Sequence, residues 1–210
     1  MSSINLEEKE NFCKTLAFFF SPPEAETIEE FQKVGWLTFF QDAITYLGGA
    51  SPLPNEISFP RELQTFFADW PEEYSRLFSG LNAQAVSLVE SFYKPWTLDP
   101  DNHLSFAREK GLLQGDSAIH VSAMYQHCGM EVAEEFRSCP DHLAVELEFL
   151  SLLYERATDR EIKSFIADHL DWVPLLKQEV CRFQPHPVYA MVLELLDFFL
   201  TREKERLMIS

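Results

Sequence analysis

Apolar residues recur every three to four positions along most of the chain, which is the spacing of one face of an α-helix. The alternation that is typical of a β-strand does not persist beyond a few residues. We therefore predict an all-α protein. The predicted helices cover residues 6–20, 25–46, 61–67, 72–78, 116–129, 141–156, 159–170, 172–183 and 189–206.

Prolines and glycines divide this helical pattern. Pro71 separates two short predicted helices, because proline removes a backbone donor and disfavours helix at the residue before it. Residues 80–115 contain glycines, prolines and turn residues with weak periodicity, and so long an irregular stretch in a compact domain is usually functional or mobile. We predict one helical bundle. This bundle is a single domain over 1–210. It has N-terminal helices in 1–80, a hinge or long irregular loop in 80–115, and C-terminal helices in 116–210.

The predicted helix at residues 141–155 is apolar around most of its circumference, which is typical of a helix in the middle of a bundle. Glu148 and Glu155 fall on its polar side, whereas Glu146 falls among apolar neighbours. A buried carboxylate is costly unless it is partnered, and His142 lies four residues earlier on the same face. We therefore predict a His142–Glu146 pair, whose attraction would raise the pKa of His142 and lower that of Glu146.

The start of this helix carries Pro140 and Asp141, and both suit their positions. Proline fits the first helical position, and an acid in the first turn interacts favourably with the helix dipole. Asp116 or Ser117 suits the N-cap of the helix after the long loop, and Gly115 suits the end of that loop. A well-formed helix start explains these residues by itself. A metal or catalytic site and a docking surface are the alternatives.

The charge balance narrows the choice of partners. The chain has 17 basic and 34 acidic residues, which gives a formal net charge of −17. A surface this acidic repels phosphate backbones, so a nucleic-acid partner is excluded from the prediction. The same surface attracts a basic peptide or a basic protein face.

Cysteine usage and the N-terminus indicate where the protein works. The four cysteines form no Cys-x-x-Cys pair, which favours reduced thiols in a cytosolic protein. The first residues are acidic and polar, unlike a secretory signal peptide. The apolar run LAFFF is far shorter than the ~20 residues that a membrane-spanning helix needs. We expect a cytoplasmic protein with no transmembrane segment.

Four segments together carry a resemblance to a known family. PDHLAVELEFLSLL (140–153) is the most specific, because it combines the Pro-Asp-His motif with a glutamate four residues after the histidine. The others, in chain order, are VESFYKPWT (89–97), GLLQGDSAIHVSAMYQHCGM (111–130) and FIADHLDWVPLL (165–176). These segments resemble the TorD/DmsD/NarJ-type chaperones, the cytoplasmic redox-enzyme maturation proteins.

The resemblance implies an all-helical chaperone that is not an enzyme. It implies binding to the apo form of a molybdopterin-dependent oxidoreductase, often through the twin-arginine signal peptide of that enzyme. Such chaperones hold the enzyme open until its cofactor is inserted, and so prevent early export. The residues assigned to peptide binding are Pro140, Asp141, His142, Gly115, Asp116, Tyr93 and Trp96, with Glu146 in support. No catalytic residue, metal ligand or cofactor is expected in the chaperone itself.

Charge and apolar content favour the same function independently. A twin-arginine peptide has a cationic pair followed by an apolar stretch, so its receptor needs carboxylates and an apolar groove. The expected mechanism is capture at an acidic, aromatic-lined groove near Asp141 and His142, with the loop at 80–115 gating access. A small helical metal-dependent hydrolase and a generic acidic helical adaptor stay open as alternatives. We expect a monomer or a domain-swapped homodimer.

Overall fold

The computed structural model describes residues 6–26, 28–29, 59–79 and 85–208. Regular structure within these ranges is helical, which confirms the all-α prediction. None of these helices combines the length and the apolar character that crossing a bilayer requires. The elements are α1 (Leu6–Phe20), α4 (Phe59–Phe78), η1 (Glu90–Phe92), α5 (Asp116–Cys128), η2 (Glu134–Phe136), α6 (Leu143–Arg156), α7 (Asp159–His169), α8 (Val173–Arg182) and α9 (Pro187–Met208).

The helices after the long loop follow the predicted bounds closely, because their sequences carry clear end signals. α7 begins with a full capping box, in which the Thr158 side chain accepts from the Glu161 backbone and the Glu161 side chain accepts from the Thr158 backbone. α5 ends at Gly129, whose φ of 70° is the left-handed conformation that glycine adopts without strain. The predicted helix at 25–46 lies mostly outside the described residues.

The predicted break at Pro71 is wrong, because α4 continues through this proline. A proline inside a helix costs about 3 kcal/mol, since it lacks a donor and crowds the preceding turn. Aromatic packing offsets that cost. Trp70 is completely buried beside Phe66 and Phe19, and its indole Nε1–H donates to the Tyr189 hydroxyl at 2.8 Å. Tertiary contacts therefore keep α4 continuous where the local sequence favours a break.

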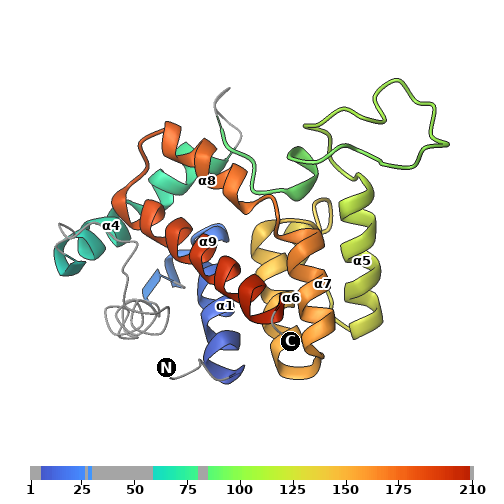
Figure 1. The fold of residues 1–210 in the computed structure, drawn as a ribbon. Coiled ribbons are helices and arrows are strands. Elements are labelled where there is room, and N and C mark those ends of the chain that lie inside the picture. The colour runs from blue at the N-terminus through green and yellow to red at the C-terminus, as the bar shows by residue number, and fades with distance from the viewer. Residues whose placement is uncertain (1–5, 27, 30–58, 80–84, 209–210) are drawn as a thin grey trace.

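α6 lies among the other helices, with α1 packed along it and α7 beside it (Figure 1). Its side chains from Leu143 to Tyr154 are buried except at Glu148 and Leu152. This confirms the prediction of a central helix. α9 contacts α1, α4, α7 and α8, and so joins the early and late helices of the described chain.

A buried ion pair joins α1 to α9. Lys9 Nζ lies 2.7 Å from Glu203 Oε1, and the Tyr154 hydroxyl donates to the other oxygen of Glu203 at 2.9 Å. A buried charge is tolerated when it is both paired and hydrogen-bonded, as Glu203 is. These bonds fix α1 against the helices that surround α6.

The irregular connection after α4 has two parts. The first, residues 88–94, is called the anchor segment here. Its backbone pairs with the start of α6, because Glu90 N–H donates to the Asp141 carbonyl at 2.9 Å and Leu143 N–H donates to the Leu88 carbonyl at 2.8 Å. The anchor segment is therefore fixed to the central helix by main-chain bonds.

The second part, residues 95–115, is called the projecting loop because it extends away from the helices (Figure 1). Its own backbone closes it: Trp96 N–H donates to the Glu109 carbonyl and Thr97 N–H to the Ala107 carbonyl, both at 2.9 Å. The connection is irregular, as predicted, but these bonds give the loop a defined shape.

Candidate binding site

Asp141 is completely buried at the start of α6. Its carboxylate Oδ2 accepts a hydrogen bond from the Ser91 backbone N–H at 2.8 Å and a second from the Ser91 hydroxyl. Burial raises the pKa of Asp141, although the bonds from Ser91 act in the opposite direction. In this position the carboxylate holds the anchor segment against α6 and does not reach the surface.

His142 is the N-cap of α6. Its Nδ1 accepts a hydrogen bond from Ala144 N–H at 3.2 Å, and its ring packs on Phe136 with the ring centroids 4.7 Å apart. Burial lowers the pKa of His142 to about 4, so the ring is neutral near pH 7. A neutral ring is what this cap requires, because a protonated Nδ1 could not accept the bond.

The predicted His142–Glu146 pair is wrong, and both predicted pKa shifts have the opposite sign. Glu146 is completely buried, as predicted, but its Oε2 accepts a hydrogen bond from Trp172 Nε1–H at 3.2 Å. Burial and the nearby charge of Glu90 raise the pKa of Glu146 well above its ordinary value. The two residues share a helix face, but each finds a partner elsewhere.

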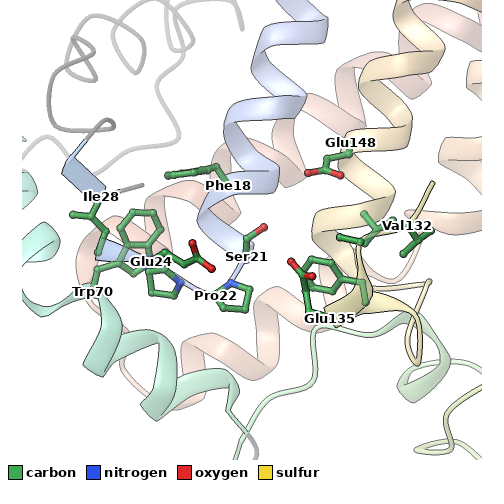
Figure 2. Close-up of a pocket in the computed structure, with 13 residues that line it drawn as sticks. Phe18, Ser21, Pro22, Glu24, Ile28, Trp70, Val132, Glu135 and Glu148 are labelled. Carbon is green, nitrogen blue, oxygen red and sulfur yellow. The ribbon is translucent and has the colours of Figure 1, made fainter. Parts of the chain in front are cut away.

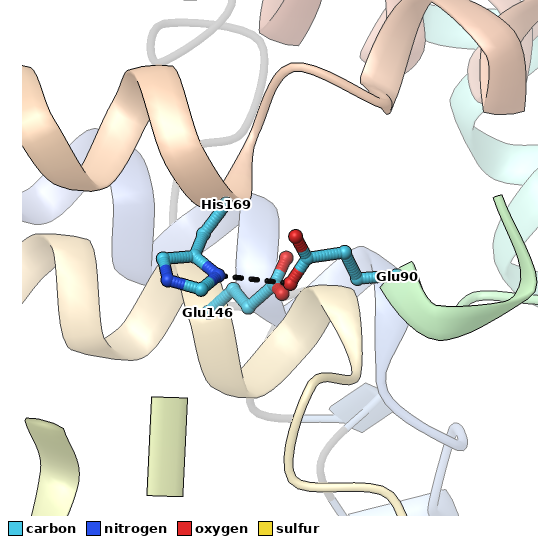
Figure 3. Close-up of side chains that lie close together, drawn as sticks. All are labelled: Glu90, Glu146 and His169. Atoms are coloured by element: carbon cyan, nitrogen blue, oxygen red, sulfur yellow. Dashed lines mark hydrogen bonds and ion pairs between the residues drawn. The ribbon is translucent and has the colours of Figure 1, made fainter. Parts of the chain in front are cut away.

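Glu146 faces Glu90 of the anchor segment and His169 at the end of α7 (Figure 3). Among the described residues, these three form the group whose donor atoms lie close enough for a metal ion, within 4.8 Å of one another. Lys94 Nζ lies 2.6 Å from Glu90 Oε1 and already supplies positive charge there. We therefore assign no metal to this group, and its burial leaves no place for a substrate.

Pro140 and Tyr93 are also internal. Pro140 is buried, and its carbonyl accepts a hydrogen bond from the Tyr125 hydroxyl at 3.2 Å. The Tyr93 ring stacks on Trp172 with centroids 4.9 Å apart, and its hydroxyl donates to the Ser87 carbonyl at 2.9 Å. Both residues therefore stabilise the junction between the anchor segment and its neighbours.

Gly115, Asp116 and Trp96 lie together at the base of the projecting loop. A Cβ at position 115 would stand 2.5 Å from the Trp96 carbonyl oxygen, so only glycine fits this close approach. The Asp116 carboxylate accepts from the Thr97 hydroxyl at 2.8 Å and from Leu98 N–H at 3.0 Å. The predicted N-cap is therefore wrong. Gly115 takes that position, because the Asp116 side chain turns to the loop.

The predicted site residues thus fall into two groups. One surrounds Asp141 at the start of α6, and the other surrounds Asp116 at the base of the projecting loop. Each group holds backbone in place. Trp96 stays partly exposed, with its ring edge against Phe106, and Asp116 is exposed. Their part in peptide binding stays a prediction.

A hollow of about 530 Å³ lies near the Pro-Asp-His motif and is linked to it through Phe136. Phe136, which packs on the His142 ring, forms part of its wall, and Val145 of α6 forms another part. Figure 2 shows Trp70 and Ile28 on one side of the hollow and Val132 on the other. We call this feature the acidic hollow. Its lining is Phe18, Ser21, Pro22, Pro23, Glu24, Ile28, Trp70, Val132, Ala133, Glu135, Phe136, Val145 and Glu148.

Three carboxylates, those of Glu24, Glu135 and Glu148, give the acidic hollow its charge (Figure 2). No ion pair joins any of them to a cation among the residues that the structure describes. Partial burial and the charge of Glu135 raise the pKa of Glu148. Two like charges beside an apolar wall would be stabilised by a cation from outside, and a guanidinium can bond to both carboxylates.

The sequence prediction missed these three residues. Glu148 was placed correctly on the polar side of α6, but a polar side is also the ordinary surface of any helix. The signal that distinguishes it is spatial. The hollow is assembled from the end of α1, α4, η2 and α6, and residues of one wall lie far apart in the sequence.

Comparisons with known proteins agree with this architecture. The chain is similar to the protein named chaperone protein TorD from Vibrio cholerae serotype O1. It is 28% identical to the protein of strain El Tor Inaba N16961 and 27% identical to those of strains Classical Ogawa 395 and M66-2. Each alignment covers 178 residues, which is 76% of this chain and 76% of the relative.

The model of one protein family matches more than half of the chain. The match runs over residues 61–178, which include α4, the anchor segment, the projecting loop and α5 to α7. That range contains the Pro-Asp-His motif and about half of the residues that line the acidic hollow. The chain therefore belongs to the family described as nitrate reductase delta subunit, to which the TorD/NarJ chaperones belong.

Proposed function

We propose that this protein is a cytoplasmic chaperone for a molybdopterin-dependent oxidoreductase. It binds the apo enzyme, with the twin-arginine signal peptide as its contact, and assists maturation until the cofactor has been inserted and export can proceed. It acts by binding and not by catalysis. Membership of the family and the similarity to proteins named chaperone protein TorD support this function.

The acidic hollow is the observation that carries the proposal for this chain. A twin-arginine peptide offers guanidinium groups and then an apolar run. The hollow offers the carboxylates of Glu135 and Glu148, which form no ion pair among the described residues, next to the partly exposed apolar side chains of Phe18 and Val132. Guanidinium–carboxylate bonds are charge-assisted and directional, so the carboxylates would fix the arginine pair while the apolar wall takes the following residues.

The Pro-Asp-His motif acts as support in this proposal. Asp141 fixes the anchor segment through Ser91, and His142 holds Phe136 in the wall of the hollow. Both are positioning residues, because neither carboxylate nor imidazole is open to a peptide. Trp96 and Asp116 at the base of the projecting loop would contact the client outside the hollow.

The experiment that tests the proposal compares two forms of one client. The catalytic subunit of a molybdopterin-dependent oxidoreductase from the same organism is prepared without cofactor and, separately, fully loaded. We expect calorimetry to detect 1:1 binding of the cofactor-free form and much weaker binding of the loaded form. Equal binding of the two forms, or of neither, would contradict the proposal. A matched client without its signal peptide measures how much of the affinity that peptide supplies.

A further inference from the structure

The carboxyl groups of Glu90, Asp141 and Glu146 lie in the interior between the anchor segment and α6, and those of Glu90 and Glu146 face each other. Glu90 and Glu146 are completely buried, and one carboxylate oxygen of each lies within 4.8 Å of the other and of a ring nitrogen of His169 (Figure 3). Two ionised carboxylates this close in a protein interior repel each other strongly, so both are ionised only if enough positive charge accompanies them.

The lysine beside this pair, Lys94, already forms ion pairs with Glu90 and Asp171. Lys94 Nζ lies 2.6 Å from Glu90 Oε1, but it also lies 2.6 Å from Asp171 Oδ1 and donates to the Asp168 carbonyl at 2.5 Å. Lys94 therefore balances Glu90 and Asp171 and leaves nothing for Glu146. A proton between the two glutamates supplies what is missing.

The hydrogen bonds of the pair also show that a donor is missing at Glu146 within the described part of the chain. Glu146 Oε2 accepts from Trp172 Nε1–H, whereas Glu146 Oε1 has no hydrogen-bond partner among the described residues. Glu90 Oε2 lies 3.0 Å from His169 Nδ1, and His169 Nε2 lies 2.7 Å from His120 Nδ1. With Nδ1–H of His169 donating to Glu90, a proton on Glu146 completes the set of donors.

We propose that Glu90 and Glu146 share one proton, carried by Glu146, and that this proton fastens the anchor segment to α6 and α7. Loss of the proton leaves two negative charges in contact inside the protein and loosens the anchor segment, which carries the projecting loop. The pair is thus a built-in control of how firmly the loop is attached. This inference does not depend on the identity of the client.

The surroundings shift the pKa values of the two carboxyl groups in opposite directions, as a single proton carried by Glu146 requires. Burial and the charge of Glu90 raise the pKa of Glu146. Burial acts to raise the pKa of Glu90 as well, but hydrogen bonds from His169 and Glu146 hold it below its ordinary value. The charged and titratable groups that face the pair from the packed elements are Lys94, Asp141, His169, Asp171, His120 and Tyr125.

The test uses Glu146→Gln in the full chain, because a glutamine amide supplies a permanent donor and does not titrate. The matched control is Glu148→Gln, an exposed position on the same helix. Hydrogen exchange of the anchor-segment amides, corrected for the intrinsic effect of pH, is followed from neutral to alkaline pH. We expect protection to fall about tenfold or more in the wild type and the control, and to stay constant in Glu146→Gln.

Infrared spectroscopy supplies a readout that does not depend on the variant. The folded wild type at neutral pH should show the C=O stretch of a protonated buried carboxyl, and Glu146→Gln should lack it. An absent band in the wild type, or the same pH response in the wild type and Glu146→Gln, would overturn the proposal. So would a change in wild-type exchange on adding EDTA, because a bound cation would then neutralise the pair.

Discussion

Two groups of three carboxylates lie close together in this protein and have opposite surroundings. Asp141, Glu90 and Glu146 are buried and take donors from the protein itself, namely Ser91, Lys94 with His169, and Trp172. Glu24, Glu135 and Glu148 line an open hollow and are not ion-paired within the described residues. The first group takes its donors from the fold, although one oxygen each of Asp141 and Glu146 has no hydrogen-bond partner among the described residues. The second group would gain its partner from a cation outside the protein.

The comparison teaches where to look for function in an acidic chain. A buried carboxylate with its own donors stabilises one arrangement of backbone, and removing it leaves those donors unpaired. An open carboxylate without a partner costs the fold little and stays available for a ligand. Changes in the buried group should therefore alter stability, and changes in the hollow should alter binding.

The largest expected effect is that of Asp141→Ala. It leaves the Ser91 N–H and hydroxyl without their acceptor inside the protein. We expect the free energy of unfolding to fall by about 3 kcal/mol, measured by urea denaturation. Glu148→Ala on the same helix is the matched control and should change it by less than ~0.5 kcal/mol. Equal effects of the two substitutions would remove the distinction between the groups.

A pH effect of similar size should come from His142. Burial lowers the pKa of His142 from 6.5 to about 4, so the unfolded chain takes up the proton first as the pH falls. Stability that is present above pH 6.5 is then lost on approaching pH 4, by roughly 3 kcal/mol in total. His142→Asn keeps a capping oxygen and does not titrate, so it should lack this part of the acid destabilisation. Denaturant midpoints at several pH values measure the difference, and parallel curves would contradict the assignment.

Trp172→Phe should have a moderate effect. It removes the Nε1–H that lies 3.2 Å from Glu146 Oε2 and 2.8 Å from the His169 carbonyl. We expect a loss of about 2 kcal/mol in the free energy of unfolding, because both buried acceptors lose a donor. Thermal and urea unfolding check this value. A neutral result would mean that water replaces the indole in this interior and that the group is less sealed than its burial indicates.

The smallest effect on stability is expected for Glu135→Gln. It removes one of two neighbouring carboxylates that have no cation beside them within the described part of the chain, so the repulsion that contributes to the raised pKa of Glu148 is relieved. The free energy of unfolding should rise or stay within ~0.5 kcal/mol. A clear loss of stability would show that Glu135 has a structural partner and belongs with the buried group.

Periodicity predicted the first helix, the helices after the projecting loop and the central place of α6, because these depend on local spacing of apolar residues. It also predicted that Glu146 is buried. It failed to predict the partner of Glu146, because Glu90 and Trp172 come from segments whose contact is set by the tertiary fold. His142 was the partner suggested by proximity in sequence alone.

Other differences have the same origin. Pro71 lies inside α4 because Trp70 packs in a buried aromatic cluster, and no local rule contains that contact. Asp116 has the right chemistry for an N-cap, but the projecting loop offers it better-placed donors. The acidic hollow needs α1, α4, η2 and α6 together, so its residues could be recognised only in the folded chain.

The central claim is that the acidic hollow receives an arginine pair, and one titration tests it most directly. A peptide with two consecutive arginines and a following apolar run is titrated into the wild type and into Glu135→Gln/Glu148→Gln. The control is Glu155→Gln/Glu205→Gln, which changes the net charge equally at exposed acids outside the hollow.

Calorimetry should show affinity reduced about 10- to 100-fold in the hollow variant and nearly unchanged in the control. If both double variants bind the peptide as tightly as the wild type, or lose the same amount, the hollow is not the receptor and the account is contradicted.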